Sequence, residues 1–175
     1  MTTETEQAKQ AELAGLYEEY YDRIARYTYT RIGNKDDAED IAGEVFLKAL
    51  QSLKSYREQG PPIQVWLFKI AHNMVVDYLR RKSKMKTVPL ESLDVADDMD
   101  PAELAEINLE IERVKTAMKR LSNDQQEVIR LRFLAGLTSR EVAYLMGKTD
   151  GAVREMQRAA LERLRQVLHE PAAGY

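Results

Sequence analysis

The 175-residue sequence contains no cysteine, which excludes disulfide bonds and thiolate metal sites. It has only two histidines and no spacing of nucleophilic or metal-ligating residues, so we expect no cofactor, and a small helical enzyme is a weak alternative. Glycine and proline are scarce, at eight and five residues, and 44% of the residues are apolar, which is typical of a folded, helix-rich protein. No apolar run approaches the roughly 18 residues that span a bilayer, and the polar N-terminus carries no secretory signal. We therefore expect a cytoplasmic protein without membrane insertion.

The formal net charge of −3 hides a segregation of charge along the chain. Residues 54–88 hold eight basic and two acidic residues, and residues 113–168 hold twelve basic and six acidic ones. Between these blocks, residues 89–112 hold nine acidic residues and no basic one. This order indicates two anion-binding modules on a linker, because solvated helix faces would more often mix the two signs.

Helical patterns dominate, and we expect an all-α fold. Apolar residues at three- and four-residue spacing, together with capping residues, predict helices at about residues 8–32, 36–53, 65–81, from 101 onward, 122–133, 138–146 and 149–168. Gly60-Pro61-Pro62 cannot continue a helix, which predicts a loop at 55–62. The acidic stretch in the middle lacks periodicity. We therefore predict one helical domain at residues 8–82, a flexible acidic linker at 83–100 and a second helical domain at 101–170.

The second domain contains a helix-turn-helix pattern over about residues 138–165. Thr138 and Glu141 form a capping box that begins a short helix, Gly147 ends it, and Thr149 caps a longer helix. In a helix-turn-helix the second helix enters the major groove of DNA. A plain helical hairpin with a charged surface is the alternative.

The last helix carries the candidate contacts to duplex DNA. A projection at 100° per residue places Arg154, Arg158 and Arg165 together, away from the apolar face, with Glu155 and Glu162 on the far side. Arginine can bridge guanine edges or phosphates, glutamate can accept from cytosine, and the helix start offers amides to a phosphate. The predicted contacts are Arg140, Thr149, Gly151, Arg154, Glu155 and Arg158.

The helix over Val65–Arg81 carries a second candidate surface. Its core-facing side is predicted to hold Leu67, Ile70, Ala71, Met74 and Tyr78. Another side carries an aromatic ring, an amide and several cations: Trp66, Lys69, Asn73 and Arg80, followed by Arg81 and Lys82. Such a stripe suits a single DNA strand, because bases stack on rings and cations hold phosphates. For Trp66 alone a half-buried core position is the more common interpretation, and the lone His72 supports no catalytic role.

The order of these motifs resembles a known family. The stretches LYEEYYDRIARYTYTRIGNKDDAEDIAGEVFLKAL, WLFKIAHNMVVDYLRRK and, after the acidic linker, LSNDQQEVIRLRFLAGLTSREVAYLMGKTDGAVREMQRAALERLR are similar to extracytoplasmic-function (ECF) sigma factors of the sigma-seventy family. The resemblance extends over nearly the whole chain. It implies a specificity subunit of bacterial RNA polymerase, without catalytic chemistry of its own, that keeps conserved regions two and four.

The resemblance also implies partners and contact residues. The helix at 36–53 would dock on the clamp coiled coil of the largest polymerase subunit through Asp37, Asp40, Glu44, Val45 and Phe46. The helix at 65–81, with its preceding loop, would capture a melted minus-ten base, and the last helix would read the minus-thirty-five element. The linker would thread toward the polymerase active-site cleft. An anti-sigma factor that covers these faces is implied as a regulatory partner.

One other class of protein stays open on the residues alone. A helix-turn-helix repressor with an N-terminal dimerisation or ligand-sensing domain would explain the second domain, but neither the basic, aromatic helix nor the acidic linker. We also expect the free chain to bind promoters poorly, because two small modules on a flexible linker need polymerase to fix their spacing.

Overall fold

The computed structural model describes residues 4–56, 60–83 and 100–170, and every regular element within these ranges is helical, which confirms the all-α prediction. Residues 84–99 of the predicted linker and 57–59 of the predicted loop lie outside the described residues. The helices are α1 (Glu4–Ile32), α2 (Lys35–Ser52), a 3-10 turn η1 (Leu53–Ser55), α3 (Ile63–Ser83), α4 (Pro101–Met118), α5 (Asn123–Ile129), a π-helical turn η2 (Arg130–Leu134), α6 (Ser139–Met146) and α7 (Asp150–His169).

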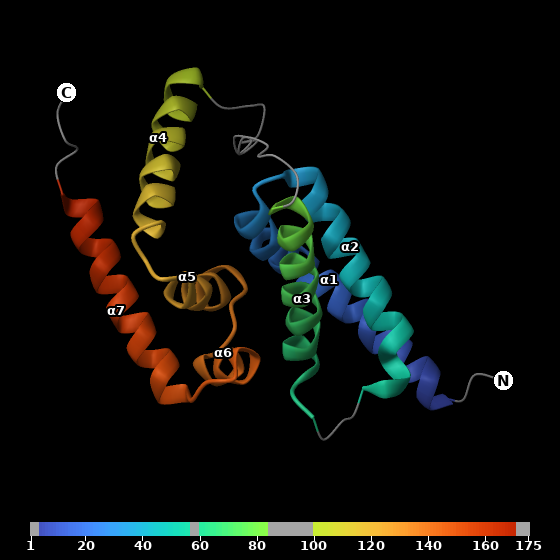
Figure 1. Ribbon diagram of the computed structural model, residues 1–175. Helices are drawn as coiled ribbons and strands as arrows, with labels where there is room; N and C mark the ends of the chain where they lie inside the picture. Colours follow the sequence, from blue (N-terminus) through green and yellow to red (C-terminus); the bar gives the residue numbers. More distant parts are fainter. Residues whose placement is uncertain (1–3, 57–59, 84–99, 171–175) are drawn as a thin grey trace.

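Helices α1, α2 and α3 form one bundle, the N-terminal module (Figure 1). Gly33 adopts a left-handed conformation with φ of 76°, which ends α1. The Asn34 side chain then accepts a hydrogen bond from the Asp37 amide at 2.9 Å and caps α2. The tight joint between the two helices makes α1 and α2 antiparallel neighbours.

The buried face of α3 is wider than the predicted stripe. Val65, Phe68 and Val75 are buried although the sequence projection did not assign them to the core, whereas Met74 and Tyr78 are only partly buried. The reason is that α3 packs against α1 and α2 and also against α6. A helix with neighbours on several sides buries a broad arc rather than one stripe.

Helices α4 to α7 form the C-terminal module, and its capping residues act as the sequence predicted. Both reciprocal hydrogen bonds of the capping box between Thr138 and Glu141 are present, and Gly147 ends α6 with φ of 66°. The Thr149 side chain accepts from the Ala152 amide and caps α7. The helix predicted at 122–133 instead changes to the π-helical turn η2 at residue 130.

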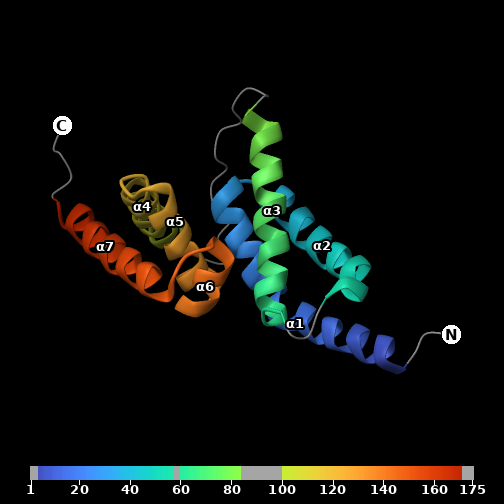
Figure 2. The same ribbon diagram turned by 60° about the horizontal axis from the view of Figure 1, so that its bottom comes forward.

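The two modules pack against each other (Figures 1 and 2). One buried apolar cluster runs through both, and its C-terminal members include Leu131, Leu137, Val142 and Leu145. In both views α6 lies beside α3. The sequence predicted two separate domains and gave no indication of this contact.

The glycine in the middle of α2 provides a test of helix energetics. A β-carbon on Gly43 would meet no atom within 4 Å, so Gly43→Ala should raise the free energy of unfolding by about 0.5–1 kcal/mol. At Gly147 the space is equally open, but φ is 66°, and Gly147→Ala should lower the free energy by about 1–2 kcal/mol. Urea unfolding of both variants measures the two changes. Equal shifts for both would show that backbone conformation does not decide them.

Candidate functional surfaces

The first surface is the exposed side of α2. The other side buries apolar residues against α1 and α3, including Val45 at 0% and Phe46 at 6% exposure. The side chains of Val45 and Phe46, which were predicted to contact polymerase, thus lie in the core of this structure, and their role in polymerase binding stays a prediction. Asp40, Glu44 and Leu47 lie on the solvent side, and Leu47 is 56% exposed. Sequence reasoning missed Leu47. Its position three residues after Glu44 places both residues on the same face of the helix, and this spacing was the available signal.

Asp37 and Lys82, which were predicted to meet different partners, form a bridge between α2 and α3 in this structure. The Tyr78 hydroxyl donates to Asp37 Oδ2 at 2.5 Å, and Lys82 Nζ lies 3.7 Å from the same oxygen. Burial and the hydrogen bond to Asp37 raise the pKa of Tyr78, so its hydroxyl stays protonated and donates. These contacts hold the C-terminal end of α3 against the start of α2.

The second surface follows α3 along its predicted DNA stripe. Lys69, Asn73 and Arg80 are exposed, and Arg81 continues the basic end. Arg80 lies 3.7 Å from Asp77 in an exposed pair that contributes little to stability. Three cationic side chains and one amide therefore remain on the solvent side of one helix.

Trp66 is half-buried and packs against the core, as a tryptophan at the start of a helix commonly does. Its ring also lies against Tyr56, with centroids 5.1 Å apart, and the Tyr56 hydroxyl donates to the Pro61 carbonyl at 3.1 Å. The sequence did not single out Tyr56. An aromatic residue just before Gly60-Pro61-Pro62 was the available signal, and the pair braces the start of α3.

The third surface is the start of α7 with the adjoining end of α6. Val142, Ala143 and Leu145 of α6 are buried with Val153 of α7, which fixes the two helices of the helix-turn-helix. The residues predicted to meet duplex DNA are all exposed: Arg140, Thr149, Gly151, Arg154, Glu155 and Arg158. Arg154 lies 3.1 Å from Asp150, which also accepts from the Ser139 hydroxyl.

The predicted placement of two glutamates was wrong. Glu155 and Glu162 do not lie on the far side of α7, because Arg158 donates to both, at 2.5 Å and 3.1 Å. Residues three and four apart on a helix share one face, and the projection had overlooked this pairing. The pairs are exposed, so Arg158 can exchange them for DNA phosphates at small energetic expense.

Sequence reasoning missed three further residues of the C-terminal module. Arg132 donates to the Leu137 carbonyl at 2.5 Å and to Gln157 Oε1 at 2.8 Å, which braces the turn before α6 against α7. Phe133 and Tyr144 are large and exposed, at 55% and 62%. The sequence contained no signal for the hydrogen bonds of Arg132 or for the exposure of the two aromatic rings, because both depend on how η2 and α6 are oriented.

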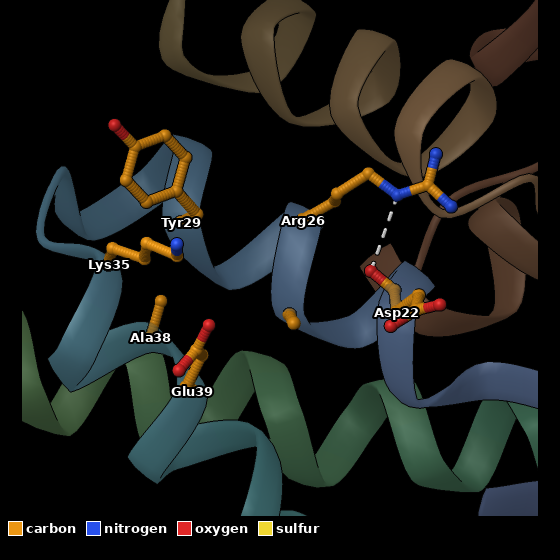
Figure 3. Close-up of a pocket in the computed structure, with 7 residues that line it drawn as sticks. Asp22, Arg26, Tyr29, Lys35, Ala38 and Glu39 are labelled. Atoms are coloured by element: carbon orange, nitrogen blue, oxygen red, sulfur yellow. Dashed lines mark hydrogen bonds between the residues drawn. The ribbon is translucent and has the colours of Figure 1, made fainter. Parts of the chain in front are cut away.

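A small open pocket of about 330 Å³ lies where α1 meets α2 (Figure 3). Its charged lining is mixed, with Asp22 and Glu39 against Arg26 and Lys35. The Arg26 side chain donates to the Asp22 carbonyl at 3.3 Å. No group of residues that could hold a metal ion occurs in the part of the chain that the structure describes. The pocket brings together none of the residues predicted to bind DNA or polymerase.

A buried carboxylate joins the two modules. Glu127 of α5 is 7% exposed and accepts from the Tyr27 hydroxyl at 2.5 Å and from Arg31 Nη1 at 2.9 Å, both on α1. His72 Nδ1 of α3 lies 3.3 Å away, and Arg130 lies 3.9 Å away. Burial would raise the pKa of Glu127, but His72, Arg31 and Tyr27 together bring it below its ordinary value.

The depressed pKa of Glu127 predicts an acid-dependent loss of stability. A carboxyl with a lowered folded pKa stabilises the fold fully above its unfolded pKa of about 4.3, and this contribution is lost as pH falls through the folded pKa. The stability difference between the wild type and Glu127→Gln should therefore be constant just above pH 5 and shrink below about pH 4. Urea unfolding of both proteins across this range measures it. A difference that grows on acidification would contradict the assignment.

Comparisons with known proteins agree with this geometry. Residues 16–85 match the model of sigma-70 region 2, and residues 117–166 match that of sigma-70 region 4. The chain is 36% identical over 172 residues to the ECF RNA polymerase sigma factor BldN of Streptomyces coelicolor, covering 97% of this chain and 65% of BldN. It is 32% identical over 148 residues to SigD of Mycobacterium tuberculosis, covering 81% of this chain and 70% of SigD.

A solved structure shares the fold. The sigma factor RpoE, in complex with the anti-sigma factor NepR from Bartonella quintana, matches with a TM-score of 0.68 at 22% identity, covering 92% of this chain and 99% of that one. Fold and sequence together thus define a two-module protein of the sigma-70 type. The chain belongs to the ECF RNA polymerase sigma factors. No helix within the described ranges combines the length and apolarity needed to cross a membrane.

Proposed function

We propose that this chain binds core RNA polymerase and directs it to specific promoters. The observation that carries the proposal is the arrangement of three separate exposed surfaces on two modules that match sigma-70 regions 2 and 4. Each surface has chemistry suited to one step: an acidic and apolar face on α2, a cationic stripe on α3, and the exposed start of α7. The protein performs no bond-making step itself; it positions polymerase and DNA.

The α2 surface is the proposed polymerase contact. Asp40 and Glu44 supply negative charge that steers a basic partner, and Leu47 supplies apolar area that such an interface can bury. The buried Val45 and Phe46 support this face from beneath. The matching helix of the family docks on the clamp coiled coil, which is the partner we propose here.

The α3 surface is the proposed contact to melted DNA. Lys69, Asn73, Arg80 and Arg81 are exposed along it and can hold phosphates and one base edge. Trp66 offers the exposed part of its ring to a base at the start of the helix. Base stacking on such a ring is worth about 1–3 kcal/mol, comparable to the energy needed to unstack the base.

The start of α7 is the proposed reader of the minus-thirty-five element. Arg154 and Arg158 are exposed and can reach base edges, while Thr149 and Gly151 place the helix start near the backbone. The exposed Arg140 of α6 adds a phosphate contact. Because the phosphate contacts carry no sequence information, Arg154 and Arg158 would carry the specificity.

Reconstituted transcription tests the function. Transcript starts mapped after overexpression define the promoter, and core polymerase with this chain should then open it and begin transcripts at those sites. The probe is permanganate reactivity of unpaired thymines near the minus-ten element. A chain that binds intact duplex alone and leaves no melted bubble with polymerase would instead be a helix-turn-helix repressor.

An anti-sigma factor is the proposed regulator. RpoE, which shares the fold, was solved with such a partner, and the three surfaces of this chain offer exposed area that a single inhibitor can cover. Since polymerase and promoters are the proposed partners, we place the protein in the cytoplasm. Co-purification with a tagged chain, with and without added core polymerase, tests this: an inhibitor that covers the three surfaces should be displaced by polymerase.

A further inference from the structure

An open cleft of about 810 Å³ lies between α3, α5 and α6, a volume within the range of small-molecule sites in proteins. Five basic side chains line it: Arg31 of α1, Lys69 and His72 of α3, Arg130 of η2, and Lys148 just after α6. Among the residues that the structure describes, two carboxylates face them, Asp124 and Glu127. The lining of the cleft therefore carries an excess of positive charge.

Two arginines share one carboxylate oxygen at this cleft. Arg31 Nη1 lies 2.9 Å from Glu127 Oε2, and Arg130 Nη1 lies 3.9 Å from the same oxygen. Arg130 also donates to the neutral Gln126 Oε1 at 3.1 Å. Burial lowers the pKa of Arg130, Glu127 offsets this in part, and the neighbouring charge of Arg31 lowers the pKa further. The positive charge of Arg130 is thus only partly compensated by the residues around it.

Two lysines extend the positive charge along the walls of the cleft. Lys69 Nζ donates to the Leu145 carbonyl of α6 at 3.4 Å, which is a long hydrogen bond to an uncharged acceptor. Lys148 Nζ lies 3.3 Å from Asp124 Oδ2, in a pair whose acid is 60% exposed. Such contacts contribute little in water. Both ammonium groups can therefore exchange them for an anion in the cleft.

The lining also includes an exposed aromatic ring. Tyr144 of α6 is 62% exposed and lines the cleft together with the amide side chain of Asn123, at the start of α5. Aromatic side chains stack on flat rings such as nucleobases, and amides can hydrogen-bond to base edges. Groups suited to an anion and a group suited to a flat heterocycle thus meet in one concave site.

This combination of groups indicates the class of ligand. The basic residues come from four segments of the chain, so an anion with several phosphates can contact more of them than a single phosphate ion can. Guanidinium groups bind phosphate oxygens in pairs, and an ammonium group binds them as a point charge. A continuous DNA strand presents its phosphates along an extended backbone, whereas a concave cleft encloses a small molecule. The lining therefore favours a small polyphosphate that carries a base.

We propose that this cleft binds a nucleoside diphosphate or triphosphate. Arg130 and Lys148 hold the phosphates, and the Tyr144 ring stacks on the base. Of the residues predicted to bind DNA or polymerase, Lys69 is the one that lines this cleft. The site therefore goes beyond the proposed function and does not depend on it.

Titration calorimetry with the full chain tests the site. The probes are ATP and inorganic pyrophosphate, without added magnesium and at about 0.15 M salt, which screens attraction between exposed charges. Each probe should bind with a stoichiometry of one. Arg130→Gln and Lys148→Gln should each weaken both probes by at least about tenfold, because each variant loses a charge-assisted contact to phosphate. Lys148 is exposed, so Lys148→Gln decides the question if Arg130→Gln fails to fold.

A third variant separates a nucleotide from a bare polyphosphate. Tyr144→Ala removes the exposed ring and leaves the basic residues in place. The affinity for ATP should fall by at least about fivefold, since the stacked base is lost. The affinity for pyrophosphate should stay unchanged, because pyrophosphate has no base.

The matched control is Arg163→Gln on α7. Arg163 is exposed and does not line the cleft, and the change removes the same formal charge as Arg130→Gln. Both affinities should stay within about twofold of the wild type. Equal weakening by Arg163→Gln and Arg130→Gln would show general attraction of anions to a basic module, and it would overturn the proposal.

Three other results would also overturn it. One is the absence of binding by both probes at concentrations up to about 1 mM. A second is an unchanged ATP affinity in Tyr144→Ala, which would remove the base from the ligand. The third concerns a single-stranded oligonucleotide: if it binds through Arg130 and Lys148 while pyrophosphate does not bind, the cleft belongs to the DNA surface.

Discussion

Changing Leu47 to aspartate should weaken binding to core RNA polymerase by at least about 30-fold while the fold stays intact. Leu47 is 56% exposed on α2, so a charge there remains in water and the free energy of unfolding should change by less than about 0.5 kcal/mol. At the centre of an interface, loss of an apolar anchor and burial of a charge typically exceed about 2 kcal/mol. Affinity for core polymerase and urea unfolding measure the two quantities on one protein.

The neighbouring residue is the matched control. Phe46 is 6% exposed, and its ring meets Tyr17 with centroids 4.9 Å apart, so Phe46→Ala should cost about 3–5 kcal/mol of stability. Any loss of polymerase binding in Phe46→Ala should follow the unfolded fraction. Wild-type polymerase affinity in a folded Leu47→Asp variant would place the interface on another face of the N-terminal module.

The second large effect is expected in the helix-turn-helix. Val153 is fully buried between α7 and its neighbours, so Val153→Asp places an unpaired carboxylate in the core and should destabilise the protein by several kcal/mol. The preceding residue Ala152 is exposed in the first turn of α7, where a negative charge is favourable. Ala152→Asp should therefore change stability by no more than about 0.5 kcal/mol in either direction.

Unfolding and DNA binding together separate the two variants. Val153→Asp should lose minus-thirty-five recognition because the recognition helix is no longer fixed. Ala152→Asp should keep its helical circular dichroism and lose duplex affinity only through repulsion of phosphates, an effect that salt weakens. Equal destabilisation by both would contradict the orientation of α7 described above.

Local features followed the sequence closely because their causes are local. The capping box at Thr138, the cap at Thr149 and the stop at Gly147 each involve residues within four positions of one another. The exposed stripe on α3 was predicted correctly at Lys69, Asn73 and Arg80, since these positions share a side of the helix. The roles of these exposed side chains in DNA binding stay predictions.

Features that depend on packing between different helices could not be predicted from local sequence patterns. Val45 and Phe46 match a motif, but only the packing of α2 on α1 and α3 shows that both side chains are buried. Glu127 resembled one more charge in a basic block, and its burial depends on residues about 100 positions earlier. Periodicity shows which residues share one face of a helix. Which other helix packs against that face depends on contacts between residues far apart in the sequence.

The sequence by itself determined the helical class, the helix limits at capped ends, the segregation of charge and the family of the protein. These properties follow from residue chemistry and from spacings of three or four positions, which can be read directly from the sequence. Tertiary structure alone decided that α6 rests on α3, that Glu127 is shared by both modules and that Leu47 is exposed whereas Phe46 is buried. Each of these depends on which surfaces meet in space, and burial of apolar area with satisfied polar groups selects that arrangement.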